Sequence, residues 1–106
     1  MVGVGSFQPT TQEFPRSLYQ LTDHIFIDTE DAVKESGDLT VPLEKGWITS
    51  ESIQSMAGFI ADKDKFHFKN GASIVFKSTG MALFDVVVAN KIYKRAIEKG
   101  VGTILE

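Results

Sequence analysis

The stretch FKSTGMALFDVVVANKIYKRA, residues 76–96, decides the fold that this sequence predicts. Its first residues continue a β-like run, whereas the small polar residues at 78–80 indicate a turn. Residues from about 81 to 99 then predict a long helix, and Gly100 is a typical helix end. Many nucleotide-binding sites have this order of strand, turn and helix, but so does the start of an ordinary buried helix.

Length and composition indicate one small globular domain that spans residues 1–106, with 42% hydrophobic and 24% charged residues. The net charge of −3 leaves no basic excess for nucleic acid. The absence of cysteine excludes disulfides and a thiol nucleophile. No apolar run reaches the roughly 20 residues of a membrane span, and residues 1–10 lack the pattern of a signal peptide. The sequence therefore predicts a cytoplasmic protein that does not enter a membrane.

The other elements are predicted from apolar periodicity and turn residues. They are a short strand near residues 2–4, a strand at 24–29, a helix at 29–37, an irregular segment at 38–47, a helix beginning near residue 49 or 50, and a strand at 73–77. The Asn70-Gly71 pair favours a hairpin between residues 66–68 and the last strand. Strands that alternate with helices predict an α/β fold with a mostly parallel sheet and flanking helices.

The first half of the long C-terminal helix, MALFDVVVAN at residues 81–90, is apolar on nearly all sides. A helix of this kind has to be covered on several faces, and a chain of 106 residues offers few elements that could do so. The pattern therefore predicts a further partner, which is either another domain or a second copy of the chain in a homo-oligomer.

The turn at residues 78–80 is the best candidate site in the sequence. Its hydroxyl and N–H groups follow a strand and precede a helix, where open α/β sheets bind ligands, but the same residues could simply cap the helix. Asp28, at a strand end, could bind a ribose or close a turn. The GVGS run at residues 3–6 lacks the third glycine of a dinucleotide loop. Two distant histidines make no convincing metal site.

Several segments together resemble the ornithine cyclodeaminase/mu-crystallin family. They are VGSFQPTTQEFP, IFIDTEDAVKESGDLTVPLEKGWI and IVFKSTGMALFDVVVANKIYKRAIEKGVG, and they cover nearly the whole chain in the order that the family has. The resemblance concerns only the C-terminal third of family members. It implies a partial Rossmann-like fold, namely the C-terminal portion of an NAD(P)-binding domain followed by a long helix that returns to an earlier domain.

The same resemblance implies NAD(P)(H) as cofactor, with a site that is incomplete in this chain. The cofactor-binding positions that it suggests are Val4, Gly5, Ser6, Lys77 and Ser78. The Gly-rich loop and the substrate-binding arginine and lysine of the family have no counterparts in these 106 residues.

Phe7 stands where the cyclodeaminases carry a catalytic aspartate, and a phenyl ring cannot act as a base. Members without that aspartate resemble ketimine reductases, alanine dehydrogenases or ligand-binding crystallins. The implied parent reaction is hydride transfer between a nicotinamide and an amino-acid-derived imine. We therefore expect a C-terminal fragment of such an enzyme, inactive alone and without a catalytic residue of its own. The alternative is a non-catalytic oligomerisation module with the same fold.

Overall fold

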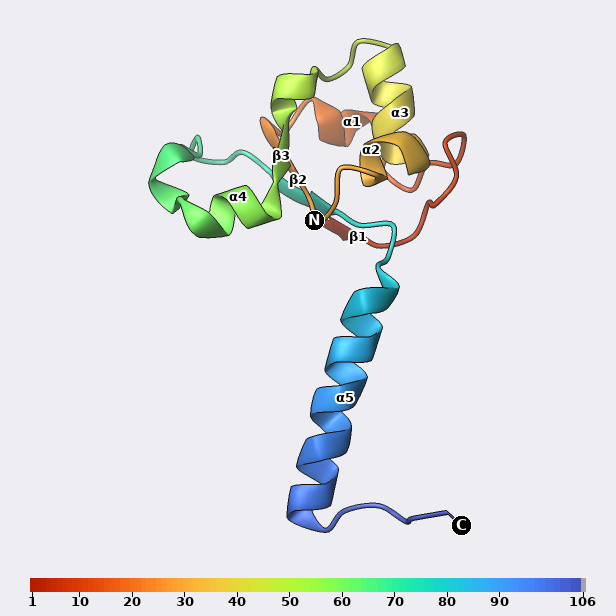
Figure 1. Cartoon of the computed structure of the whole chain (residues 1–106). Helices are drawn as coiled ribbons and strands as arrows, with labels where there is room; N and C mark the ends of the chain where they lie inside the picture. The colour runs from red at the N-terminus through yellow and green to blue at the C-terminus, as the bar shows by residue number, and fades with distance from the viewer. Residues whose placement is uncertain (106) are drawn as a thin grey trace.

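The computed structural model describes residues 1–105 and shows a small parallel sheet, helices that flank it, and one long helix that leaves it (Figure 1). The strands are β1 (Val2–Gly3), β2 (His24–Ile27), β3 (Ile53–Ser55) and β4 (Ile74–Lys77). The helices are α1 (Arg16–Tyr19), α2 (Ala32–Glu35), α3 (Gly37–Glu44), α4 (Met56–Ala61) and α5 (Ala82–Lys99), with short 3-10 turns η1 (Ser50–Ser52) and η2 (Lys63–Lys65). This confirms the predicted α/β class.

The strand order is β1-β4-β2-β3, and every pairing is parallel. Strand β4 lies between β1 and β2, with Lys77 in register with Gly3 on one side and with Ile27 on the other. Because the strands are parallel, their carboxyl ends all lie at the same edge of the sheet. The segments that follow β1, β4 and β2 are neighbours there, although they are far apart in the sequence.

The hydrophobic core lies on one face of the sheet, between the strands and α1 to α3. Alternation along β2 sends Ile25 and Ile27 to this face and Phe26 to the other. The core residues are Phe14, Leu18, Tyr19, Ile25, Ile27, Ala32, Leu39, Ile48 and Val75. On the opposite face, Phe26 contacts a cluster of aromatic rings, which are His24, Phe59, Phe66 and Phe68.

Helix α5 projects away from the sheet, and the molecule measures 56 × 34 × 21 Å (Figure 1). Its bounds agree with the predicted helix, and it ends at Gly100, whose φ of 62° is left-handed. Its apolar side chains are exposed, for example Leu83 at 61% and Val86 at 65%. The residue that precedes its first turn is Met81, without a side-chain capping bond. The turn at residues 78–80 therefore does not cap helix α5, which was one of the two roles that its sequence allowed.

The segment at 38–47 was expected to be irregular, and this prediction is wrong. It contains α3, which Ser36 begins by accepting a hydrogen bond from Asp38 N–H at 3.2 Å. Pro42 lies inside this helix and cannot donate to the carbonyl of Asp38, four residues before it. That carbonyl accepts from the Tyr19 hydroxyl at 2.9 Å instead. A tertiary contact thus replaces the missing helical bond.

The prediction of a helix from residue 49 or 50 is also wrong for the first half of that segment. Ile53 belongs to β3 and pairs with Ile25, so its apolar character serves the sheet and not a helix face. Helix α4 begins only at Met56, where Ser55 accepts from Gly58 N–H at 3.3 Å. The predicted hairpin is absent too, because residues 66–68 form no strand and their two phenylalanines join the aromatic cluster.

Candidate functional site at the carboxyl edge of the sheet

Three strand ends meet around Ser78, the first residue after β4. Its N–H donates to the Gly3 carbonyl at 3.0 Å, which joins it to the end of β1. Its hydroxyl donates to Asp28 Oδ2 at 2.5 Å, which joins it to the end of β2. The sequence placed candidate residues on these three strands separately, and the structure brings them to one edge.

Among residues 1–105, the hydrogen bonds of the buried Ser78 leave one acceptor position of its hydroxyl unused. The proton is given to Asp28, and one lone pair accepts from Gly80 N–H at 3.0 Å. A serine hydroxyl has two acceptor positions, so one lone pair remains. Asp28 Oδ1 accepts from Thr29 N–H at 2.9 Å, which fixes the carboxylate in place. Asp28 therefore holds the orientation of Ser78 and also closes its own turn.

The end of β1 has an exposed side and a side held by the protein. The Val4 side chain is 61% exposed. Gly5 lies so close to Glu13 that a Cβ would fall 2.2 Å from Glu13 Oε1. Ser6 has a φ of 49°, a left-handed conformation that costs a non-glycine residue about 1–2 kcal/mol. Its hydroxyl is held by the Thr11 carbonyl, which compensates for part of this strain.

Lys77, the last residue of β4, has a fully buried side chain. Its ammonium donates to the Gly5 carbonyl at 2.5 Å and lies 2.9 Å from Asp38 Oδ2 and 3.2 Å from Glu13 Oε2. Every one of these partners belongs to the protein. The ammonium is thus enclosed on the core side of the sheet, whereas the neighbouring Ser78 faces the carboxyl edge.

Asp38 is the buried anion that balances this ammonium. Its Oδ1 accepts from the N–H groups of Glu13 and Phe14, at 2.7 and 2.9 Å. Its Oδ2 makes the ion pair with Lys77, which is close but not aligned as a hydrogen bond. Removing one partner of such a buried pair typically costs about 3–5 kcal/mol, because it leaves an uncompensated charge. The pair therefore locks β4, α3 and the loop before α1 together.

Tyr19 closes this buried region from the side of α1. Burial of its ring and, secondly, the negative charge of Asp38 raise the pKa of the Tyr19 hydroxyl to about 12. The phenol is therefore neutral at physiological pH and remains a donor to the Asp38 carbonyl. It stabilises α3 and has no open side for proton transfer.

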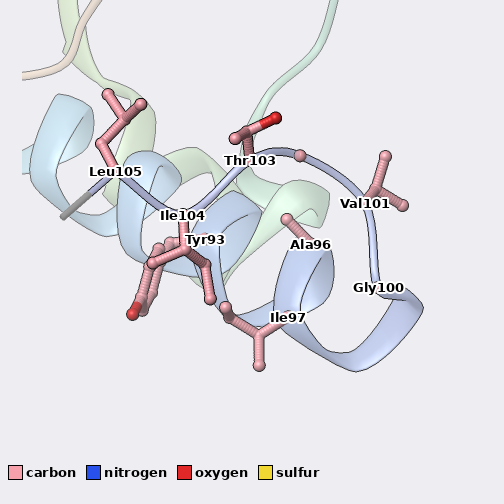
Figure 2. Close-up of a pocket in the computed structure, with 9 residues that line it drawn as sticks. Tyr93, Ala96, Ile97, Gly100, Val101, Thr103, Ile104 and Leu105 are labelled. Carbon is pink, nitrogen blue, oxygen red and sulfur yellow. The ribbon is translucent and has the colours of Figure 1, made fainter.

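Two surface hollows lie elsewhere on the molecule. One is formed where the chain turns at Gly100, at the end of α5 far from the sheet (Figures 1 and 2), and its lining is Tyr93, Ala96, Ile97, Gly100, Val101, Gly102, Thr103, Ile104 and Leu105. The other lies between α2, α3 and β3, and includes Ile27, Val33, Lys34, Leu43 and Ile53. Neither contains Ser78 or the end of β1, so neither is the candidate site.

Sequence reasoning did not identify Glu13 and Asp38 as supports of the site. Asp38 stood inside a Gly-Asp-Leu run that carries the family resemblance, which was the available signal, but no local pattern assigned it a partner. Phe7 is 71% exposed and contributes no acid or base. None of these observations tests the cofactor roles assigned to Val4, Gly5, Ser6, Lys77 and Ser78, which remain predictions.

Comparison with known proteins agrees with this geometry. The model of the ornithine cyclodeaminase/mu-crystallin family matches residues 1–100. The chain belongs to this family. Among curated members, a Delta(1)-pyrroline-2-carboxylate reductase of Bacillus cereus is 38% identical over 105 residues, which are 97% of this chain and 32% of that protein.

Two solved structures of family members are similar in fold. Thermococcus litoralis Delta(1)-pyrroline-2-carboxylate reductase, in complex with NADH and L-proline, superposes with a TM-score of 0.74 at 29% identity, covering 98% of this chain and 32% of that one. An archaeal alanine dehydrogenase dimer with bound NAD gives 0.67 at 27% identity, covering 99% and 33%. The chain thus spans about a third of the length of these relatives. Within residues 1–105, no helix has the length and apolar content needed to span a membrane.

Proposed function

We propose that this chain is the C-terminal part of an NAD(P)-dependent enzyme of the family, that it supplies one edge of the nicotinamide site, and that it does not turn over substrate by itself. The main support for the proposal is that Ser78 and the end of β1 lie together at the carboxyl edge of a parallel sheet. Ligands bind at this edge in open α/β sheets. A similar protein of known structure is in complex with NADH, which supports a nicotinamide cofactor for the family fold.

The residues at this edge suit the nicotinamide end of the cofactor. Ser78 offers a hydroxyl lone pair to a carboxamide N–H, and the exposed Val4 offers an apolar surface to a ring. The cofactor, when bound, supplies or accepts the hydride. Within the described residues, no Gly-rich loop is present to hold the pyrophosphate. The site is therefore proposed to need further protein from outside this chain.

The proposed substrate class is a cyclic imine derived from an amino acid, or the corresponding amino acid in the reverse direction. Two findings support this choice. The pyrroline-2-carboxylate reductases are similar over nearly all of this chain, and Phe7 offers no carboxylate for the deaminase chemistry. In this view the chain's own residues bind and orient the nicotinamide, and the substrate groups come from outside it.

A chimera tests the proposal directly. Residues 1–100 of this chain replace the matching segment of the Bacillus cereus reductase, and NADH oxidation with Delta(1)-pyrroline-2-carboxylate is measured. We expect the chimera to be active and the isolated 106-residue chain to be inactive. A folded chimera that does not bind NADH would contradict the cofactor role, and turnover by the isolated chain would contradict its dependence on further protein.

A second candidate function, an oligomerisation module, is favoured by α5. Side chains such as Phe84 and Val88 lie one turn apart and are 51% and 54% exposed. Burying one side chain of this kind contributes about 1.5–3 kcal/mol. A self-association constant in the ten-micromolar range needs only about 7 kcal/mol. We propose that two copies meet through this helix when no other protein covers it.

Sedimentation of the chain measures this association. Replacing Phe84 and Val88 by serine is expected to give monomers, while the matched replacement of Lys91 and Arg95, also one turn apart on α5, should leave association intact. A wild-type chain that remains monomeric at tens of micromolar, roughly the concentration set by that energy, would exclude this module.

A further inference from the structure

The buried ammonium of Lys77 has a consequence for the end of β1. It lies 2.5 Å from the Gly5 carbonyl, which is therefore drawn towards the buried ion pair with Asp38. A carbonyl and the N–H of the next residue point in opposite directions in a trans peptide, and the chain has no cis peptide bond in its described part. The Ser6 N–H is thus aimed away from the ion pair.

This N–H has no acceptor of its own among residues 1–105. Ser6 is also held at a φ of 49°, in a left-handed conformation that residues other than glycine rarely adopt. Its hydroxyl, bound to the Thr11 carbonyl, keeps it there. Strained residues that the surrounding structure holds in place gather at ligand sites. A hydrogen bond from an ammonium to a carbonyl also polarises the peptide and strengthens its N–H as a donor.

We propose that Lys77 is a positioning residue, which turns the Gly5–Ser6 peptide so that the Ser6 N–H donates to an oxygen of the bound ligand. The inference rests on the proposed function for the identity of that oxygen, which is the carboxamide oxygen of nicotinamide. In this proposal Lys77 acts on the cofactor only indirectly, in place of the direct contact that the resemblance suggested, because its ammonium is enclosed by Gly5, Asp38 and Glu13. Its effect on the ligand passes through one peptide group.

The arrangement explains why a buried charge lies directly behind the end of β1. A neutral side chain could fill the same volume, but only a charged donor would hold the Gly5 carbonyl and two carboxylates together. Glu13 belongs to the same group of interacting residues as Lys77 and Gly5. Its side chain is 43% exposed and lies where a Cβ on Gly5 would be. The missing side chain at Gly5 lets Glu13 approach the ammonium.

Residual dipolar couplings of the ¹⁵N-labelled full chain give the direction of the Ser6 N–H and test the positioning role. In Lys77→Met we expect the Ser6 N–H to change direction and its proton to shift upfield, while the couplings of β2 stay as in the wild type. Lys77→Arg should restore the wild-type direction in part. The control is Lys69→Met, which removes an exposed lysine paired with Asp23 and should change nothing at Ser6.

A role limited to stability would lower the unfolding midpoint of Lys77→Met but leave the Ser6 N–H direction unchanged, and that result would overturn the proposal. If Lys77→Met does not fold, Glu13→Gln replaces it, because Glu13 is partly exposed. It should shift the same proton in the same direction by less. An unchanged Ser6 resonance in Glu13→Gln would then overturn the proposal equally.

Titration of the wild-type chain with millimolar NADH tests the donor role. We expect the amide resonances of Ser6 and Ser78 to shift together, and the shift at Ser6 to be lost in Lys77→Met or reduced in Glu13→Gln. A shift at Ser78 without one at Ser6 would overturn this inference and leave the proposed function standing. No shift at either residue would count against both the inference and the proposed nicotinamide site.

Discussion

Single side chains determine how the carboxyl edge is arranged. Ser78 shares its hydroxyl between Asp28 and Gly80, and so connects two strand ends that lie fifty residues apart in the sequence. Lys77, its neighbour, points to the opposite side and is enclosed by carboxylates. Successive residues of extended backbone face opposite sides of a sheet, and Ser78 directly follows the last residue of β4. The same dipeptide therefore serves the site with one residue and the core with the other.

Replacing Ser78 by alanine should destabilise the chain by about 1–3 kcal/mol, because it leaves Asp28 Oδ2 without its donor. Urea denaturation measures this change. The control is Thr79→Ala, whose hydroxyl contacts Glu35 at the surface and should contribute less than about 0.5 kcal/mol. If the two variants were equally stable, the hydrogen bond between Ser78 and Asp28 would make no measurable contribution to the stability of the fold.

Tyr19 should make the stability depend on pH in the alkaline range. Its pKa is raised from 10.0 to about 12, chiefly by burial and next by Asp38. The neutral form is thus favoured in the fold, so its contribution is complete below pH 10 and is lost as pH rises towards 12. The total is roughly 2–3 kcal/mol.

Tyrosinate absorbance measures this shift, because the chain has two tyrosines. In Tyr93→Phe the remaining absorbance belongs to Tyr19 and should appear with a midpoint near 12. A midpoint at the ordinary value of a free tyrosine would contradict the buried position of the ring. Adding Tyr19→Phe to the same variant should remove the absorbance change entirely.

At the scale of elements, close backbone approaches determine where the helices sit. Helix α3 begins at Gly37, directly against the loop that follows β1. Its N–H donates to the Gln8 carbonyl at 2.9 Å, and a Cβ at this position would lie 2.4 Å from the Thr11 carbonyl oxygen. A backbone atom cannot move aside as a flexible side chain can. The absence of a side chain at Gly37 therefore fixes how α3 packs.

Gly37→Ala should destabilise the chain by about 1–3 kcal/mol through overpacking. Gly58→Ala is the matched control inside α4, where the nearest atom to the new methyl group is 3.7 Å away. It should be neutral or stabilising by about 0.5–1 kcal/mol, since alanine is the better helix former. Thermal unfolding of both variants measures the difference, and a tolerated alanine at Gly37 would mean that α3 can shift on its loop.

For the whole molecule, the notable feature is that α5 is separate from the folded body. Its eighteen residues form a helix about 27 Å long. None of its described residues is buried. The sheet face opposite the core is also only partly covered, since Val2 is 66% and Ile74 is 47% exposed. Both surfaces are apolar, and both fit a chain that spans a third of its relatives' length.

Ending the chain after Gly80 should leave the body folded. In dilute solution, where self-association does not contribute, we expect its unfolding free energy to stay within about 0.5 kcal/mol of the full chain. Denaturation followed by the fluorescence of Trp47, the single tryptophan, reports on the body alone. A marked loss of stability would show that α5 packs on the sheet in solution.

The sequence by itself determined the α/β alternation, strand β4, the bounds and apolar nature of α5, and the family. These features rest on local periodicity and on residues in a fixed order. The tertiary structure alone decided three others: the strand at Ile53, the helix that contains Pro42, and the burial of Lys77. Each depends on a partner distant in sequence, namely Ile25 for the strand, Tyr19 for the helix carbonyl and Asp38 for the ammonium. Local propensity does not encode such partners, because their free energy appears only when the chain is closed around them.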